Sequence, residues 1–144
     1  MDTKMLETML SLIYDAPCEK LYDKEDKLYF GIINRSVKAL SILDDEKLFD
    51  NIIQTDINGN IVNEYDLSLK SGEYYIAELK KSEHGKYRRD RLIVFNKDME
   101  IIKEYINDDN NNYTISTLDD NTRIIHNSNG NDYNIDGTII ERQV

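Results

Sequence analysis

Three stretches of the sequence decide the fold: DINGNIVNEYDL at 56–67, NKDMEIIKEYIN at 96–107 and NIDGTIIERQV at 134–144. In each stretch a polar turn is followed by two apolar residues, and in the first two by further charged and apolar residues in alternation. Such alternation is typical of a strand with one buried face. The pairs Asn58-Gly59 and Asp136-Gly137 predict hairpins, because glycine tolerates the positive φ of a tight turn. The middle stretch has Asp98-Met99 instead, so we expect a different turn or a bulge there.

A second set of similar stretches precedes these turns: LSILDDEK at 40–47, IAELKKSE at 76–83 and ISTLDDNT at 115–122. Both sets recur with a period of about 36–40 residues, which indicates a repeated supersecondary unit. In the middle unit the pattern predicts three strands, at 74–79, 91–95 and 100–106. Upstream, KLYDKEDKLYFGII at 20–33 predicts one more hairpin that closes around 24–26.

The N-terminal residues 1–16 predict an amphipathic helix. Asp2 or Thr3 is suited to its N-cap, and Pro17 lies just beyond its end. Five apolar residues share one face of this helix: Met5, Leu6, Met9, Leu10 and Ile13. We expect the helix to cover an open end or a face of the sheet. Docking of a partner on this methionine-containing stripe is the alternative.

Repeats of this length and pattern resemble β-propeller blades. The middle unit, YYIAEL at 74–79 followed by RRDRLIVFNKDMEII at 88–102, is similar to an NHL-type blade: a strand, a loop ending in arginine, an apolar strand and a polar hairpin. The resemblance implies an architecture and no particular function. Propellers need four or more blades of four strands each, so three to four units with three visible strands each cannot close a ring.

The expected fold is therefore mostly β. An N-terminal helix precedes an antiparallel β-meander of three to four repeats over residues 20–144, which forms an open barrel or a partial propeller-like sheet. A chain of 144 residues is long enough to bury one core, so we expect a single domain over 1–144.

Composition narrows the class of protein. Hydrophobic residues make up 40% of the chain and charged residues 32%, which argues against disorder and against membrane spanning. Cys18 is the only cysteine, which fits a reducing, cytoplasmic compartment. Richness in Asn, Ile, Lys, Asp and Tyr indicates an AT-rich genome, as in some bacteria and their phages. The net charge of -10 disfavours direct binding to DNA.

One segment, residues 80–91 (KKSEHGKYRRDR), is basic in this acidic background. It carries six Lys and Arg against Glu83 and Asp90, and we expect it to form a loop with its tip at His84-Gly85. Arginine forks bind phosphate and an adjacent aromatic ring can stack on a base. The segment therefore predicts a site for an anionic ligand such as a nucleotide, unless its charges are paired with neighbouring acidic turns. The candidate residues are Lys80, Lys81, His84, Lys86, Tyr87, Arg88, Arg89 and Arg91.

Acidic turns form the second candidate surface. They are expected to gather along one rim that contacts a basic partner, and they comprise Asp44, Asp45, Glu46, Asp108, Asp109, Asp119 and Asp120. A calcium site is not expected, because no Glu closes the DINGN stretch at the position that calcium loops use. With His84 and His126 as the only histidines, we expect no metal site and no cofactor.

No pattern in the chain predicts an enzyme. Phosphate-binding glycine loops and nucleophile elbows are absent from the sequence, and Cys18 has no adjacent base to activate it. The leading hypothesis is a non-enzymatic inhibitor whose acidic surface occludes a basic or nucleic-acid-binding partner protein, in the manner of immunity or anti-defence proteins. Sequestering or sensing of an anionic small molecule through residues 80–91 is the alternative. A third possibility is a structural repeat protein with neither activity, which forms a homo-oligomer as one segment of a larger ring.

Overall fold

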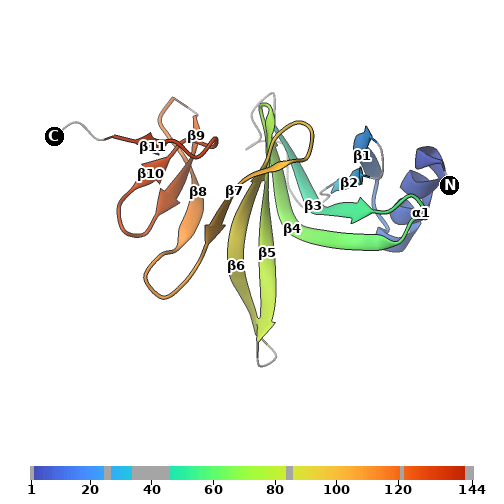
Figure 1. The fold of residues 1–144 in the computed structure, drawn as a ribbon, viewed down its shortest axis with the longest axis horizontal. Coiled ribbons are helices and arrows are strands. Elements are labelled where there is room, and N and C mark those ends of the chain that lie inside the picture. The colour runs from blue at the N-terminus through green and yellow to red at the C-terminus, as the bar shows by residue number, and fades with distance from the viewer. Residues whose placement is uncertain (1, 25–26, 34–45, 84–85, 121, 142–144) are drawn as a thin grey trace. The chain divides into compact units, whose positions relative to one another are not determined.

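The computed structural model describes residues 2–24, 27–33, 46–83, 86–120 and 122–141, and for 46–47, 67–68, 80–83 and 86–89 it describes the backbone alone. The chain divides into two compact units, residues 1–70 and 71–144, and each is described by itself (Figure 1). The prediction of a mostly β fold with one N-terminal helix and an antiparallel meander is confirmed. Among the described strands neither sheet closes into a barrel. The single domain stays a prediction.

The first unit contains one helix and a meander of strands that are hydrogen-bonded in chain order, β1-β2-β3-β4. Strands β1 and β2 form the predicted hairpin, with Lys24 opposite Lys27. The elements are α1 (Thr3–Tyr14), β1 (Cys18–Lys24), β2 (Lys27–Ile33), β3 (Glu46–Thr55) and β4 (Ile61–Ser71).

Helix α1 begins after one of the two predicted N-cap residues and ends at Tyr14, two residues before the predicted end at 16. Asp2 is its N-cap, and the Asp2 carboxylate accepts a hydrogen bond of 2.8 Å from the Met5 backbone N–H. Asp15 adopts a left-handed conformation at the C-cap, with φ 50°. The helix buries Leu6 and Leu10 against a cluster that includes side chains of β2 and β3. It therefore covers a face of the sheet, as expected.

The second unit is built from two antiparallel sheets. One has the order β5-β6-β7 and the other β11-β10-β9-β8. Side chains of both sheets share one core, formed by Ile76, Leu92, Val94, Tyr105 and Ile125. The strands are β5 (Tyr74–Glu83), β6 (Lys86–Phe95), β7 (Ile101–Ile106), β8 (Tyr113–Thr117), β9 (Arg123–Asn127), β10 (Asp132–Tyr133) and β11 (Ile139–Ile140).

The recurring element of the fold is a three-residue hairpin turn. In each copy the N–H of the first residue donates to the carbonyl of the fifth, and the carbonyl of the first accepts from the N–H of the fourth. The fourth residue has positive φ. This is the expected geometry of a type I turn followed by a left-handed residue. The three predicted copies are Asp56–Asn60, Asn96–Glu100 and Asn134–Thr138. Asn127–Asn131 is a fourth copy, and its sequence NSNGN resembles DINGN closely enough that inspection of the chain could have found it.

The sequence predicts a different turn or a bulge at Asp98-Met99. The turn is the same as in the other copies, but the β6–β7 register does shift beside it, between Val94 and Phe95. Met99 has φ 57° and takes the place that Gly59 and Gly137 hold in the other copies. The Met99 N–H bonds to the Asn96 carbonyl at 3.0 Å, as Gly59 bonds to Asp56 at 3.1 Å. A left-handed conformation costs a residue with a Cβ about 1–2 kcal/mol. Met99 is 1% exposed, so burial of its side chain offsets this cost.

The second repeat landmark does not correspond to one structural position. Leu79 lies inside strand β5, which continues to Glu83. Leu118 lies in the turn after β8, where its N–H bonds to the Thr122 carbonyl at 2.9 Å. The third member, Leu43, lies outside the described residues. The repeat therefore recurs as a turn, and the strands that precede the turns differ in length.

Candidate functional site

The basic segment is part of a β-hairpin, so the expectation of a loop over residues 80–91 is wrong. Strands β5 and β6 pair as far as Glu83 and Lys86, and only residues 84–85 at the tip lie outside the description. Strand β7 pairs with β6 only from Arg91 to Phe95, so the half of β6 that holds residues 86–90 continues beyond it (Figure 1). The charged residues of this segment carry no apolar alternation, so the sequence pattern did not indicate strands.

The backbone register places basic residues opposite one another in this hairpin. Lys80 pairs with Arg89, and Lys81 pairs with Arg88. Ser82 is opposite Tyr87 and Glu83 is opposite Lys86. Like charges at directly opposed positions destabilise a sheet unless an anion or a carboxylate lies close to them. His84 lies outside the described residues.

Acidic side chains hold Arg91, the one basic candidate whose side chain the structure describes. Its Nε bonds to Asp90 Oδ2 at 2.7 Å, and its Nη1 lies 3.7 Å from Glu104 Oε1. The hydrogen bond that Arg91 donates to Asp90, followed by the nearby charges of Asp90 and Glu104, raises the pKa of Arg91. Arg91 therefore belongs to a salt-bridge network on the sheet. An anion site on this hairpin would therefore use the other basic candidates and not Arg91.

The acidic candidates do not form one rim in the second unit. Asp108 and Asp109 precede strand β8, whereas Asp119 and Asp120 follow it. A strand of five residues spans about 17 Å at ~3.3 Å per residue, so the two pairs lie at opposite ends of β8. Asp44 and Asp45 lie outside the described residues, and only the backbone of Glu46 is described, as the first residue of β3.

Two of these carboxylates stabilise their own turns. Asp108 Oδ1 accepts backbone hydrogen bonds from Asn110 and Asn111, both at 2.8 Å. Asp120 Oδ1 accepts one from the Thr122 N–H at 3.0 Å. Hydrogen bonds from the Thr122 side chain and backbone lower the pKa of Asp120. The turn hydrogen bonds give both aspartates a structural role that does not require a partner protein.

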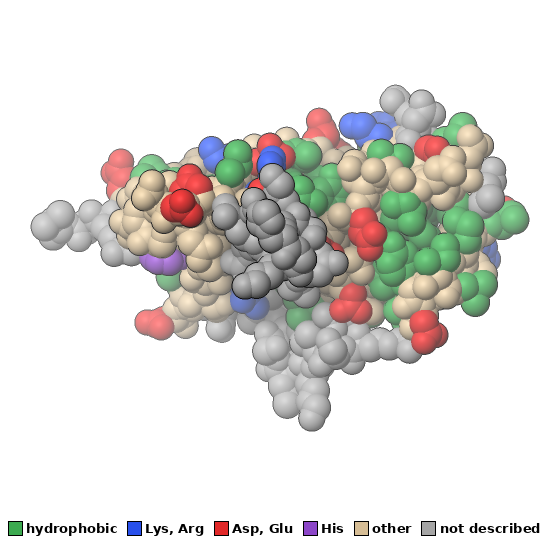
Figure 2. Space-filling model, turned by 90° about the horizontal axis from the view of Figure 1, so that it is seen from below, with side chains coloured by type: hydrophobic (Ala, Val, Ile, Leu, Met, Phe, Trp, Pro, Cys, Tyr) green, Lys and Arg blue, Asp and Glu red, His purple; other side chains and the backbone are tan. Residues whose placement is uncertain are grey.

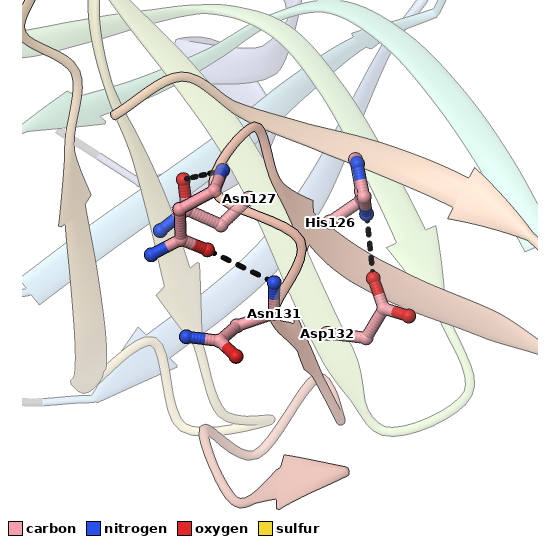
Figure 3. A network of polar contacts seen from close by, with 5 residues as sticks. His126, Asn127, Asn131 and Asp132 are labelled. Carbon is pink, nitrogen blue, oxygen red and sulfur yellow. Dashed lines mark hydrogen bonds and ion pairs between the residues drawn. The ribbon is translucent and has the colours of Figure 1, made fainter. Parts of the chain in front are cut away.

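The described histidine, His126, is a structural residue. It lies opposite Asp132 across β9 and β10, and its Nδ1 is 2.6 Å from Asp132 Oδ1 (Figure 3). The adjoining turn is closed by Asn127 and Asn131, whose backbone groups bond at 2.8 Å. The interpretation of His126 as a strand residue with a bonded ring is thus confirmed. The contact joins the two central strands of the four-stranded sheet.

Cys18 is held as a neutral thiol. Burial, and then the charges of Glu7 and Glu19, raise its pKa to about 12. A thiol needs a lowered pKa to act as a nucleophile near neutral pH. The surroundings of Cys18 therefore act in the opposite direction to those of a catalytic cysteine.

Helix α1 also has apolar side chains that lie largely outside the core and face solvent. Leu12 is 78% exposed, Ile13 60% and Met5 58%. Met5, Met9 and Leu12, spaced as one helical stripe, line a groove of about 520 Å³ together with Asp2, Lys4 and Thr8. Leu12 also lines a second groove, of about 350 Å³, together with Pro17 and Cys18. Figure 2 shows hydrophobic side chains at the surface of the first unit.

The placement of Met5 and Ile13 corrects the sequence analysis. Both were expected on the face that covers the sheet, yet only Leu6 and Leu10 are fully buried there, with Met9 partly buried. A helix crossing a sheet contacts it along a narrow stripe, so the broad apolar arc leaves a second stripe in solvent. The breadth of the arc was visible in the sequence, because Leu12 adds to it.

Comparisons with protein-family models, curated proteins and solved structures gave no match. Within the described part of the chain, no group of three or more His, Cys, Asp and Glu side chains is arranged to hold a metal ion. The same residues contain no helix that is long and apolar enough to cross a membrane.

Proposed function

We propose that this is a non-enzymatic binding protein that occludes a basic partner protein, and that the partner docks on the outer stripe of α1, formed by Met5, Met9 and Leu12. The observation that carries the proposal is the exposure of Leu12 and Met5 beside the 520 Å³ groove. Fully burying one such side chain contributes about 1.5–3 kcal/mol. Helices that present apolar anchors at this spacing are a recurrent mode of recognition between proteins.

The charges around the stripe define the partner. Residues 2–19 contain four acidic side chains, Asp2, Glu7, Asp15 and Glu19, against Lys4 alone, so this segment has a net charge of −3 (1 − 4). The whole chain carries -10. An apolar segment flanked by Lys and Arg, such as one face of an amphipathic helix in a nucleic-acid-binding protein, complements this surface. Complementary charge mainly speeds association and excludes wrong partners.

Calorimetric titration with a synthetic helical peptide tests the proposal. The peptide carries a leucine stripe flanked by lysines, and a matched peptide carries glutamates in their place. We expect the lysine peptide alone to bind, more weakly at high salt, and Leu12→Ser to reduce its affinity at least tenfold. Leu118→Ser is the control, since Leu118 is an exposed leucine of the second unit. Equal binding to the Leu12 variant, or no binding, refutes the proposal.

A second candidate function is favoured by the register of the basic hairpin. The opposed pairs Lys80–Arg89 and Lys81–Arg88 concentrate positive charge on a two-stranded segment. An anion such as a nucleoside triphosphate would relieve the repulsion between them.

Titration with ATP and with inorganic triphosphate tests this second function. If the hairpin binds the anion, the double change Arg88→Ala and Arg89→Ala abolishes binding of both compounds. Lys97→Ala, at an exposed lysine in a turn, leaves binding unchanged. Because both arginines lie in a strand, circular dichroism must show that the variant is folded.

A further inference from the structure

A cleft of about 310 Å³ runs along the free edge of strand β7 in the second unit. Four consecutive residues of β7 line it, from Lys103 to Ile106. Successive side chains of a strand point to opposite faces, so a cleft that touches all four borders the edge of the strand. Among the described strands, β7 is hydrogen-bonded to β6 alone. Its outer edge therefore offers backbone N–H and C=O groups to a further strand.

Strand β7 is also unusually apolar on its exposed surface. Ile101, Ile102 and Ile106 are 49%, 39% and 54% exposed. An edge strand with such side chains is suited to β-strand addition, in which an incoming segment gains both backbone hydrogen bonds and apolar contacts. Lys103 and Glu104 provide the only charges on the strand.

The far wall of the cleft favours a positive charge. It is formed by Tyr113, Tyr133, Asn111 and Asp108. The rings of Tyr113 and Tyr133 are 6.4 Å apart and tilted by 47°, and aromatic faces attract ammonium and guanidinium groups. Lys103 Nζ already lies 5.7 Å from the centre of the neighbouring Tyr105 ring. The charged residues lining the cleft are Lys103, Glu104 and Asp108, which gives a net of −1 (1 − 2).

A second copy of the chain fits this edge poorly. Two identical antiparallel strands are related by a two-fold axis perpendicular to the sheet, so the residue at the axis opposes itself. The two registers that overlap β7 most completely place Lys103 opposite Lys103, or Glu104 opposite Glu104. Like charges directly opposite one another are unfavourable. A heterologous segment avoids this.

We infer that the edge of β7 and its cleft form a docking site for an extended peptide segment of another protein, with a Lys or Arg side chain that enters the cleft between Asp108 and the rings of Tyr113 and Tyr133. A volume of about 310 Å³ accommodates a single long side chain, being at the lower limit of ~300 Å³ for small-molecule sites. The site is separate from the α1 stripe, so either proposal can fail without the other.

Titration of the ¹⁵N-labelled protein with a seven-residue peptide, acetyl-Thr-Val-Thr-Lys-Thr-Val-Thr-amide, tests the inference. A matched peptide has norleucine in place of lysine, which keeps the length and removes the charge. We expect the lysine peptide to bind at least tenfold more tightly, and to slow hydrogen exchange at alternate amides of Ile101–Ile106. Asp108→Asn should reduce this preference, because asparagine can keep the turn bonds to Asn110 and Asn111 while it removes the charge.

Asp109→Asn is the matched control, since Asp109 is exposed and does not line the cleft. It should leave binding unchanged, as should Leu12→Ser in α1. Equal affinities for the two peptides would overturn the basic-side-chain specificity. Binding without new protection in β7 would overturn strand addition. A concentration-dependent dimer that competes with the peptide would show that a second copy occupies the edge instead.

Discussion

The ring of Phe49 lies directly on the backbone of Gly31, in neighbouring strands of the first unit. A β-carbon at position 31 would come within 2.5 Å of two carbons of that ring. Phe49 is almost completely buried, so its ring has no free space to move into. The glycine is therefore required by the phenylalanine, and not by an unusual backbone conformation.

We expect Gly31→Ala to destabilise the protein by about 1–3 kcal/mol, the usual cost of overpacking a core. Alanine is otherwise the better residue in a strand, so the sign of the effect identifies the ring contact. Denaturant unfolding of Gly31→Ala, Phe49→Leu and the double variant measures the coupling. The double variant should be less destabilised than the sum of the two single changes. Additive losses would show that the ring does not limit residue 31.

Met99 leads to a second prediction, because it is a buried residue with positive φ. Met99→Ala keeps the backbone strain and loses the buried side chain, so it should cost about 2–5 kcal/mol. Met99→Gly loses the same contacts but relieves about 1 kcal/mol of strain. Glycine should therefore be tolerated better than alanine, which reverses the usual order. The equivalent position Gly59 provides the comparison, because Gly59→Ala there adds strain without removing a side chain. If Met99→Ala is the more stable variant, the strain is absent.

The turns show how far the sequence could predict the fold. The Asn-Gly and Asp-Gly pairs identified two hairpins, because only a few residue types accept their backbone geometry. The same geometry at Met99 could not be predicted, since its cost is offset by burial, which depends on tertiary packing. The predicted strand at 74–79 extends to Glu83 and the one at 91–95 begins at Lys86. The added residues are mostly charged and lack apolar alternation, so the pattern that predicts strands could not find them.

The candidate site was less predictable than the fold. The sequence indicated a helix with a broad apolar face, but which residues of that face remain exposed depends on the width of the sheet contact. The cleft beside β7 combines Tyr133 with residues of β7 and β8, and no local pattern links positions so far apart. Of the residues that line the cleft, Asp108 is the only candidate that the sequence indicates, and the sequence predicts it in an acidic rim.

Cys18 should react slowly with alkylating reagents in the native protein. Its pKa rises from 9.0 to about 12, so at pH 8 the native state holds roughly 1000-fold less thiolate than the unfolded state. Iodoacetamide labelling followed by mass spectrometry, with and without urea, measures the ratio. Burial is the largest cause of the shift, so Glu7→Gln should increase the native rate only slightly. Labelling at the same rate with and without urea would contradict this account.

The hydroxyl of Tyr105 leads to a prediction about alkaline pH. Within the described residues this buried oxygen has no hydrogen-bond partner, and burial raises the Tyr105 pKa from 10.0 to about 12. The folded state therefore holds its proton more tightly than the unfolded state. This group therefore leaves the free energy of unfolding independent of pH below pH 10, and lowers it progressively as the pH rises from 10 towards 12. A shift of two units corresponds to about 2–3 kcal/mol at ~1.36 kcal/mol per unit.

Tyr105→Phe separates this contribution from those of other groups that titrate in the same range, such as Tyr14. At pH 7 the variant should be as stable as the natural protein or more stable, by up to about 1–2 kcal/mol, because a buried hydroxyl without a partner is removed. Between pH 10 and 12 its stability should fall less steeply. Urea unfolding at pH 7, 9, 10 and 11 measures both effects. A loss of more than about 1 kcal/mol at pH 7 would mean that the hydroxyl makes a favourable bond, and a parallel fall with pH would mean that Tyr105 does not titrate differently in the folded state.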